Sequence, residues 1–352
     1  MGEWRCLRCM SSRRNSWGEN VDPVVHHRFH TAAGVDRRAH GPLARREFLA
    51  SLPSDLDDAE SGRAPAFIVG AGRSGTTALG RALANCSRLN YYFEPVDRWF
   101  AVSPATDYGG LFDSRAGHCV LKAAEVDDAL RVRFRRVFRH ALADDGQMLE
   151  KTPINAFRIG FLDAIDPRTK YIEIRRDGTD VVRSIVQLSR RNDYNVLGRA
   201  RANRWWGAND CKWRSLSSEV SELEIEPEFL VPEAEFATRA AIEWIASLKS
   251  VERASAQLGD RLYRVNHSDL VSRPEETLAG IAAFLGVPEG DWMIRAGESV
   301  RISTRRSRMP LVLPGAIARR LNAWNERLGF AGRAIEGPHL SGFTTECQTT
   351  SD

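Results

Sequence analysis

The sequence predicts a three-layer α/β fold in which a mainly parallel central sheet carries helices on both faces. Between residues 66 and 285, short strand-like segments, apolar or of alternating polarity, are followed in turn by longer segments of helical period. The first strand-like segment runs into a helix through the glycine-rich turn GAGRSG. Because each helical crossover returns the chain to a parallel strand, helices are expected on both faces of the sheet.

The individual elements follow from apolar patterning and from turn and helix signals. Pro153 and Pro274 are placed to open helices, and Gly286 is placed to close one. The expected strands are 66–69, 89–93, 118–122, 148–151, 171–175 and 261–266, and the expected helices are 77–85, 127–142, 153–161, 180 onward, 237–258, 274–285 and 315–328.

Residues 189–234 interrupt this alternation with an irregular insertion that contains Trp205, Trp206 and Trp213. A long insertion in a compact domain is usually a functional lid or a disordered loop. A substrate-facing lid and a packing role for the tryptophans are both open alternatives.

Composition places the chain among soluble globular proteins rather than membrane proteins. Its 352 residues are 43% hydrophobic and 27% charged, and no run approaches the roughly 20 apolar residues of a membrane span. The N-terminal region lacks the apolar core of a signal peptide, and six irregularly placed cysteines do not form a disulfide framework. We therefore expect a cytoplasmic enzyme.

The net charge of +4 is confined to the N-terminal region. Residues 1–48 contain nine arginines and five acidic residues, so the remainder is neutral overall and no nucleic-acid partner is expected. Residues 1–62 are predicted to be a largely disordered basic extension and linker, apart from a short possible helix at 42–52. Residues 63–340 form the enzyme domain and 341–352 a polar tail.

A single CxxC, Cys6 and Cys9, is followed by His26, His27 and His30 in this extension. Zinc binding is the alternative to disorder here. Zinc sites more often show a second ligand pair at tighter spacing, so no metal is expected.

The glycine-rich turn has the features of a phosphate cradle. Gly70 and Gly75 have the spacing of the nucleotide-binding P-loop, but Thr76 stands where that motif has lysine, and the cation lies inside the loop at Arg73. Glycines let backbone N–H groups approach an anion, and the N-terminus of the following helix favours negative charge at the same place. A P-loop-like fold without the usual lysine is therefore expected, and a degenerate P-loop and a plain strand-to-helix turn are the alternatives for this stretch.

The loop with its internal cation resembles the 5′-phosphosulfate loop of sulfotransferases that use 3′-phosphoadenosine 5′-phosphosulfate (PAPS). Further matches follow in the order found in that family: EKTP at 150–153, RRDGTDVVRS at 175–184, and YRVNHSDLVSRPEETLAGIAAFLGVP at 263–288. In style the motifs resemble those of carbohydrate-type and bacterial members, and together they span residues 66–288. The resemblance implies a sulfotransferase domain over 63–340.

The resemblance also implies roles for individual residues. Glu94 would take the proton of the acceptor hydroxyl, Lys151 would stabilise the transferring sulfuryl group, and Arg73 would contact the donor phosphates. Arg176 and Ser184 would hold the 3′-phosphate, with Arg305 and Arg306 as possible further contacts. The remaining expected cofactor contacts are the loop residues Gly72, Ser74, Gly75, Thr76 and Thr77.

The expected function is transfer of a sulfuryl group from PAPS to a hydroxyl group of a carbohydrate, glycolipid or small metabolite, without a metal. His118 is interpreted as a core or edge residue, and it and Glu150 are the alternatives to Glu94 as general base. A P-loop kinase or ATPase, or a non-catalytic nucleotide-binding relative, is the alternative function.

Overall fold

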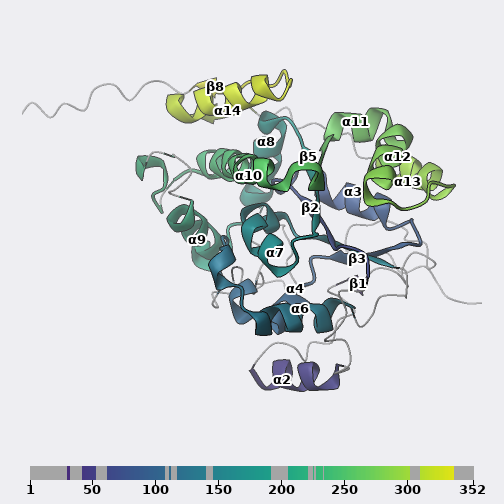
Figure 1. Cartoon of the computed structure of the whole chain (residues 1–352). Helices are drawn as coiled ribbons and strands as arrows, with labels where there is room; N and C mark the ends of the chain where they lie inside the picture. Colours follow the sequence, from purple (N-terminus) through teal and green to yellow (C-terminus); the bar gives the residue numbers. More distant parts are fainter. Residues whose placement is uncertain are drawn as a thin grey trace, which may run out of the picture.

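The structure is a computed structural model that describes residues 30–31, 42–52, 62–107, 111, 117–139, 146–191, 205–220, 225, 227–232, 234–301 and 310–336. In this part of the chain, a six-stranded sheet runs through the centre of the molecule in the order β1-β3-β4-β2-β5-β6 (Figure 1). Every neighbouring pair of strands is parallel. The strands are β1 His30–Thr31, β2 Ala66–Val69, β3 Leu89–Phe93, β4 Gln147–Lys151, β5 Lys170–Arg175 and β6 Leu262–Asn266.

Helices cover both faces of this sheet, which confirms the predicted three-layer α/β class. The helices are α2 Pro42–Ser51, α3 Thr76–Leu83, α4 Val96–Val102, α6 Asp128–Arg139, α7 Ile159–Ile165, α8 Gly178–Arg191, α9 Cys211–Glu219, α10 Phe236–Leu258, α11 His267–Ser272, α12 Pro274–Leu285, α13 Trp292–Arg301 and α14 Gly315–Arg327. A second, short parallel pair joins β7 Val312–Leu313 to β8 Ile335–Glu336.

The alternation of side chains along β2 shows how the layers divide. Ala66 and Ile68 pack with α3, α12 and α13, whereas Phe67 and Val69 pack with α4, α6 and α7. A third apolar cluster joins α8, α10 and α14 to the tryptophans of the insertion. All four residues of β2 are buried, as expected for a central parallel strand.

The strand predicted at 118–122 is wrong. The chain there is irregular and continues into the 3-10 helix Ala123–Glu125. The N–H of Cys119 donates to Ser215 Oγ at 2.9 Å, and the N–H of Val120 donates to Glu219 Oε2 at 2.7 Å. Side chains of α9 therefore accept the hydrogen bonds that a neighbouring strand would otherwise take.

The insertion is also more ordered than the sequence suggested. The helix α9 and the 3-10 helices Ala208–Asp210 and Pro227–Phe229 lie within 189–234, while residues 192–204 are outside the described residues. The buried Trp205, Trp206 and Trp213 have a packing role. Outside the insertion, the helices α4, α11 and α13 were not predicted.

At the N-terminus, the possible helix at 42–52 is confirmed as α2. The described residues exclude Cys6, Cys9, His26 and His27, together with the polar tail, and only the backbone of His30 is described. The boundaries of the extension and of the enzyme domain stay predictions. Within the described part of the chain, no helix has both the length and the apolar character needed to cross a membrane.

Candidate functional site

The phosphate loop joins the buried strand β2 to α3 at the carboxyl edge of the sheet. Gly70 and Gly75 have φ angles of 139° and 102°, and Arg73 between them has φ 72°. A Cβ at Gly70 would lie 2.5 Å from the carbonyl oxygen of Ile174 in the neighbouring strand β5, so the loop backbone passes too close for any side chain. The chain therefore makes a tight turn here, and the N–H groups at the end of the turn lie at the N-terminus of α3.

The other loop residues that were predicted as cofactor contacts lie in the turn or at the start of α3. Ser74 and Thr76 are buried, the N–H of Ser74 donates to Ala71 O at 3.1 Å, and Thr76 and Thr77 form the first turn of α3. The N-terminus of this helix offers unpaired backbone N–H groups and positive dipole charge, and both favour a phosphate or sulfate group.

Arg176 and Ser184 meet Arg73 at the loop, although each lies more than a hundred residues after it in the chain. Arg73 Nε donates to Ser184 Oγ at 3.0 Å, and Arg176 Nη1 donates to the carbonyl oxygen of Arg73 at 3.1 Å. Arg176 follows β5 directly and Ser184 lies on α8. The nearby carboxylate of Asp180 lies 3.7 Å from Arg176.

Glu94 and Lys151 form a close ion pair at the same edge. Lys151 Nζ lies 2.6 Å from Glu94 Oε1; the side chain of Lys151 is fully buried, whereas that of Glu94 is 17% exposed. In the sheet, Lys151 is the register partner of both Ile68 and Phe93, so it lies between the strand that leads to the loop and the strand that leads to Glu94.

The two charges of this pair depend on each other. Burial lowers the pKa of Lys151, and the neighbouring carboxylate of Glu94 raises it again. The Lys151 ammonium also lies 4.1 Å from the centre of the Phe93 ring. The Lys151 ammonium is therefore kept away from bulk water, next to the Glu94 carboxylate, which is partly exposed to solvent.

Glu150, one of the two alternatives to Glu94, is a buried structural anchor. Its side chain has no exposed surface and accepts hydrogen bonds from Trp99 Nε1 at 3.2 Å, Asn155 Nδ2 at 2.7 Å and Thr152 Oγ1. Burial raises its pKa to about 7. These bonds tie α4 to the end of β4.

His118, the other alternative, lies on an exposed edge. Its side chain is 57% exposed and its Nδ1 lies 3.0 Å from Glu219 Oε1 on α9. Arg305 and Arg306 lie outside the described residues. Of the sequence-predicted candidates, the structure brings together the loop residues with Arg176 and Ser184, and separately Glu94 with Lys151.

Two side chains at the loop were not predicted from the sequence. A Cβ at Gly75 would lie 2.6 Å from His267 Cδ2, and a Cβ at Gly72 would lie 2.6 Å from Trp205 Cη2. His267 follows β6 directly, so its position at the carboxyl edge of a parallel sheet was a usable signal. Trp205 belongs to the insertion, whose path no periodicity indicates.

The residues at the loop have the donor chemistry of an anion-binding site. Two guanidinium groups, a serine hydroxyl and a helix N-terminus gather at one sheet edge, which is the donor chemistry that phosphates require. Within the described residues, no cluster of three or more His, Cys, Asp or Glu is placed to hold a metal ion.

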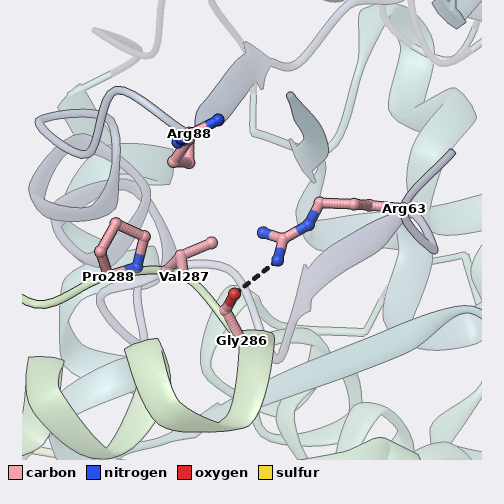
Figure 2. A pocket seen from close by; sticks show the side chains of 5 residues that line it. All are labelled: Arg63, Arg88, Gly286, Val287 and Pro288. Carbon is pink, nitrogen blue, oxygen red and sulfur yellow. Dashed lines mark hydrogen bonds between the residues drawn. The ribbon is translucent and has the colours of Figure 1, made fainter. Parts of the chain in front are cut away.

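A separate cavity of about 520 Å³ lies at the opposite, amino edge of the sheet (Figure 2). Arg63 and Arg88 line it from the segments that precede β2 and β3, and Val287, Pro288 and Gly286 complete it. Arg63 Nη2 donates to Gly286 O at 2.6 Å. Because the loop follows β2, this cavity is not part of the site at the carboxyl edge.

Comparison with solved structures found distant likenesses. The sulfotransferase domain from the curacin biosynthetic pathway is 15% identical, with a TM-score of 0.47, and the match covers 76% of this chain and 98% of that one. Sulfotransferase STF9 from Mycobacterium avium is 12% identical, with a TM-score of 0.48, over 86% of this chain and 84% of that one. Because both TM-scores are below 0.5, nothing is concluded from these two likenesses.

A mouse sulfotransferase complexed with PAP is 14% identical, with a TM-score of 0.37, over 72% of this chain and 71% of that one. No curated protein matched the chain. The model of the sulfotransferase family matches residues 65–220, which include the phosphate loop, Glu94, Lys151 and the segment from Arg176 to Ser184. Over this region, which is less than half of the chain, the sequence is similar to the sulfotransferase family.

Proposed function

We propose that the protein transfers a sulfuryl group from PAPS to a hydroxyl group of a carbohydrate, glycolipid or small metabolite. The match of residues 65–220 to the sulfotransferase family model supports sulfuryl transfer. The observation that carries the choice of donor is the meeting of Arg73, Arg176 and Ser184, through hydrogen bonds of 3.0 and 3.1 Å at the loop.

The loop and the Arg176 segment serve different phosphates in this proposal. The loop N–H groups and Arg73 bind the 5′-phosphosulfate side, and Arg176 and Ser184 bind the 3′-phosphate. Because Ser184 Oγ accepts its hydrogen bond from Arg73, the hydroxyl proton of Ser184 can be donated to a phosphate oxygen. The guanidinium of Arg176 supplies a planar, charged donor for the same group.

Glu94 and Lys151 serve the acceptor side. The bound donor supplies an activated sulfuryl group, and adenosine 3′,5′-bisphosphate leaves after in-line displacement. Glu94, open to solvent on one side, takes the proton of the acceptor hydroxyl. Lys151 stabilises the negative charge that develops on the transferring oxygens, and its fully buried position strengthens that interaction. The protein's contribution is positioning and charge stabilisation.

Calorimetry tests the donor assignment directly. Adenosine 3′,5′-bisphosphate is expected to bind far more tightly than ADP, because ADP lacks the 3′-phosphate that Arg176 and Ser184 recognise. EDTA is expected to leave binding unchanged. Equal affinities for the two nucleotides, or binding that requires magnesium, would favour the kinase alternative.

The proposal also covers the cellular location of the enzyme and the kind of acceptor it uses. The small, irregular set of cysteines suits a reducing compartment, so we place the enzyme in the cytoplasm, acting on a hydroxylated acceptor rather than on nucleic acid. Cell fractionation followed by immunoblotting tests this location, and recovery with a membrane or extracellular fraction would contradict it.

A further inference from the structure

Two neighbouring residues of α10, Glu243 and Trp244, contact the two phosphate segments. These are the phosphate loop and the segment from Arg176 to Ser184. Glu243 Oε2 accepts a hydrogen bond from Trp205 Nε1 at 2.9 Å, and the Trp205 ring lies against Gly72 of the phosphate loop. Trp244 Nε1 donates to the carbonyl oxygen of Arg176 at 3.2 Å. One helix therefore contacts the 5′ half and the 3′ half of the proposed donor site through successive side chains.

The contact with the loop is fixed by a buried ion pair. Lys212 Nζ lies 2.7 Å from Glu243 Oε1, both side chains are only 5% exposed, and the ammonium lies 4.3 Å from the centre of the Trp205 ring. Each carboxylate oxygen of Glu243 thus has its own donor. The ion pair with Lys212 therefore holds the Glu243 carboxylate in place as the acceptor for Trp205 Nε1.

The contact of Trp244 with the segment that follows Arg176 resembles that of Trp205 with the loop, because a tryptophan ring again lies against a glycine. A Cβ at Gly178 would lie 2.8 Å from Trp244 Cη2, so the ring occupies the space beside that glycine. Trp244 is 1% exposed. In both halves, a tryptophan tied to α10 packs on a glycine of the segment that would hold a phosphate group.

We propose that Glu243 and Trp244 are positioning residues that set the two phosphate segments separately, Glu243 through Trp205 for the 5′ side and Trp244 for the 3′ side. The inference rests on the proposed PAPS-dependent function. It predicts that weakening one contact affects one phosphate and spares the other, whereas a general packing role would affect every nucleotide alike.

The test measures binding of adenosine 3′,5′-bisphosphate, adenosine 5′-monophosphate and adenosine 3′-monophosphate to the full chain by calorimetry. Trp205→Phe removes the indole N–H and the outer ring, so affinity for the two nucleotides with a 5′-phosphate should fall about 3- to 10-fold, the effect of one hydrogen bond. The 3′-monophosphate should change less than about twofold. Trp244→Phe should show the reverse pattern.

Trp213→Phe is the matched control. Trp213 is fully buried in the same insertion and donates to Val231 O at 3.0 Å, away from the loop, so its change should leave all three affinities unaltered. A loss of similar size for all three nucleotides in Trp205→Phe or Trp244→Phe, or no loss in either variant, would overturn the inference. Failure of the unmodified protein to bind the bisphosphate would instead refute the proposed function.

A double-variant experiment covers the case in which a tryptophan variant folds poorly. Gly72 is not among the positive-φ glycines, so Gly72→Ala adds a clash with the Trp205 ring without backbone strain. Gly72→Ala alone should weaken binding of the 5′-phosphate, and Trp205→Phe in the same chain should cause no further loss than it causes alone, because it removes the outer ring that the new Cβ would meet. Additive losses in the double variant would count against the proposed contact.

Discussion

Arg73 and Glu94, on which the proposed chemistry depends, both have left-handed backbone conformations, with φ angles of 72° and 43°. Such conformations cost roughly 1–2 kcal/mol for residues with a side chain. Each is held by contacts on both sides: Arg73 by Arg176 and Ser184, and Glu94 by Lys151, whose carbonyl accepts its N–H at 2.9 Å and whose ammonium pairs with its carboxylate. The strain marks residues whose orientation matters for the site.

At Arg176, we expect Arg176→Ala to weaken binding of adenosine 3′,5′-bisphosphate by about 1.5–3 kcal/mol, the scale of a hydrogen bond to a charged group. Ser184→Ala should have a smaller effect because serine contributes a neutral donor. Arg191→Ala is the control, because Arg191 is an exposed charge at the end of α8, the helix that carries Ser184. Unchanged affinity in a folded Arg176→Ala protein would refute the 3′-phosphate assignment.

At Glu94, we expect Glu94→Gln to lower turnover at least about 100-fold, with little change in cofactor affinity. The glutamine oxygen can still accept the hydrogen bond from Lys151, but it cannot take a proton. Without the carboxylate, the pKa of Lys151 loses its main opposing influence and falls further, which adds to the loss. The exposed Glu289→Gln is the control; near-normal turnover in Glu94→Gln would show that another group is the base.

At the scale of single elements, α2 supports the helix that follows Glu94. Arg45 Nε donates to Phe100 O and Ala101 O at 3.1 and 3.0 Å, and its Nη2 donates to Val102 O at 3.3 Å. These are the last carbonyl groups of α4, which a helix end leaves unpaired. The sequence indicated α2 but gave no sign of this docking, because it depends on a single arginine rather than on apolar periodicity.

We therefore expect Arg45→Ala to lower the free energy of unfolding by about 1–3 kcal/mol, since it removes a donor from the carbonyl groups of Phe100 and Ala101. Val102 O keeps its hydrogen bond from Arg133 Nε at 2.8 Å. The neighbouring Arg46 is exposed, and Arg46→Ala should stay within about 0.5 kcal/mol of the unmodified protein. Urea unfolding of the two variants provides the measurement. Equal stabilities would mean that α2 does not support α4.

At the scale of the whole molecule, Glu150 should make stability depend on pH. Its pKa is raised from 4.5 to about 7 by burial, so the folded protein binds a proton more tightly than the unfolded chain. This contribution is fully present below about pH 4.5 and is lost as pH rises through 7, on the order of 3 kcal/mol. Asn155 Oδ1, buried without a hydrogen-bond partner in the described structure, could accept the Glu150 proton if the amide turned over.

Glu150→Gln should remove this dependence because glutamine does not titrate. Urea unfolding of both proteins from pH 5 to pH 8 should show the unmodified protein losing stability relative to the variant as pH rises. Titration of all other groups cancels in the difference between the two curves. Parallel curves would show that Glu150 is ionised throughout.

The sequence predicted the fold class because strand and helix periods alternate strongly and because proline and glycine mark the helix ends at Pro274 and Gly286. It placed Arg176 and Ser184 on the correct strand end and helix. It failed where the structure depends on contacts between distant side chains. Residues 118–122 look like a strand until Ser215 and Glu219 are present to accept their N–H groups, and nothing local indicates that Trp205 reaches Gly72.

The strand order has a consequence for how the chain is made. β2 pairs with β4 and β5, whose register partners at Leu149 and Lys170 lie about eighty and a hundred residues later than Ala66. At a synthesis rate of 5–20 residues per second, the strand that carries the loop waits roughly 5–20 s for both neighbours. Such distant pairings make folding slow. The glycine loop emerges early from the ribosome but closes late, after an exposed interval in which a chaperone would protect an unpaired apolar strand.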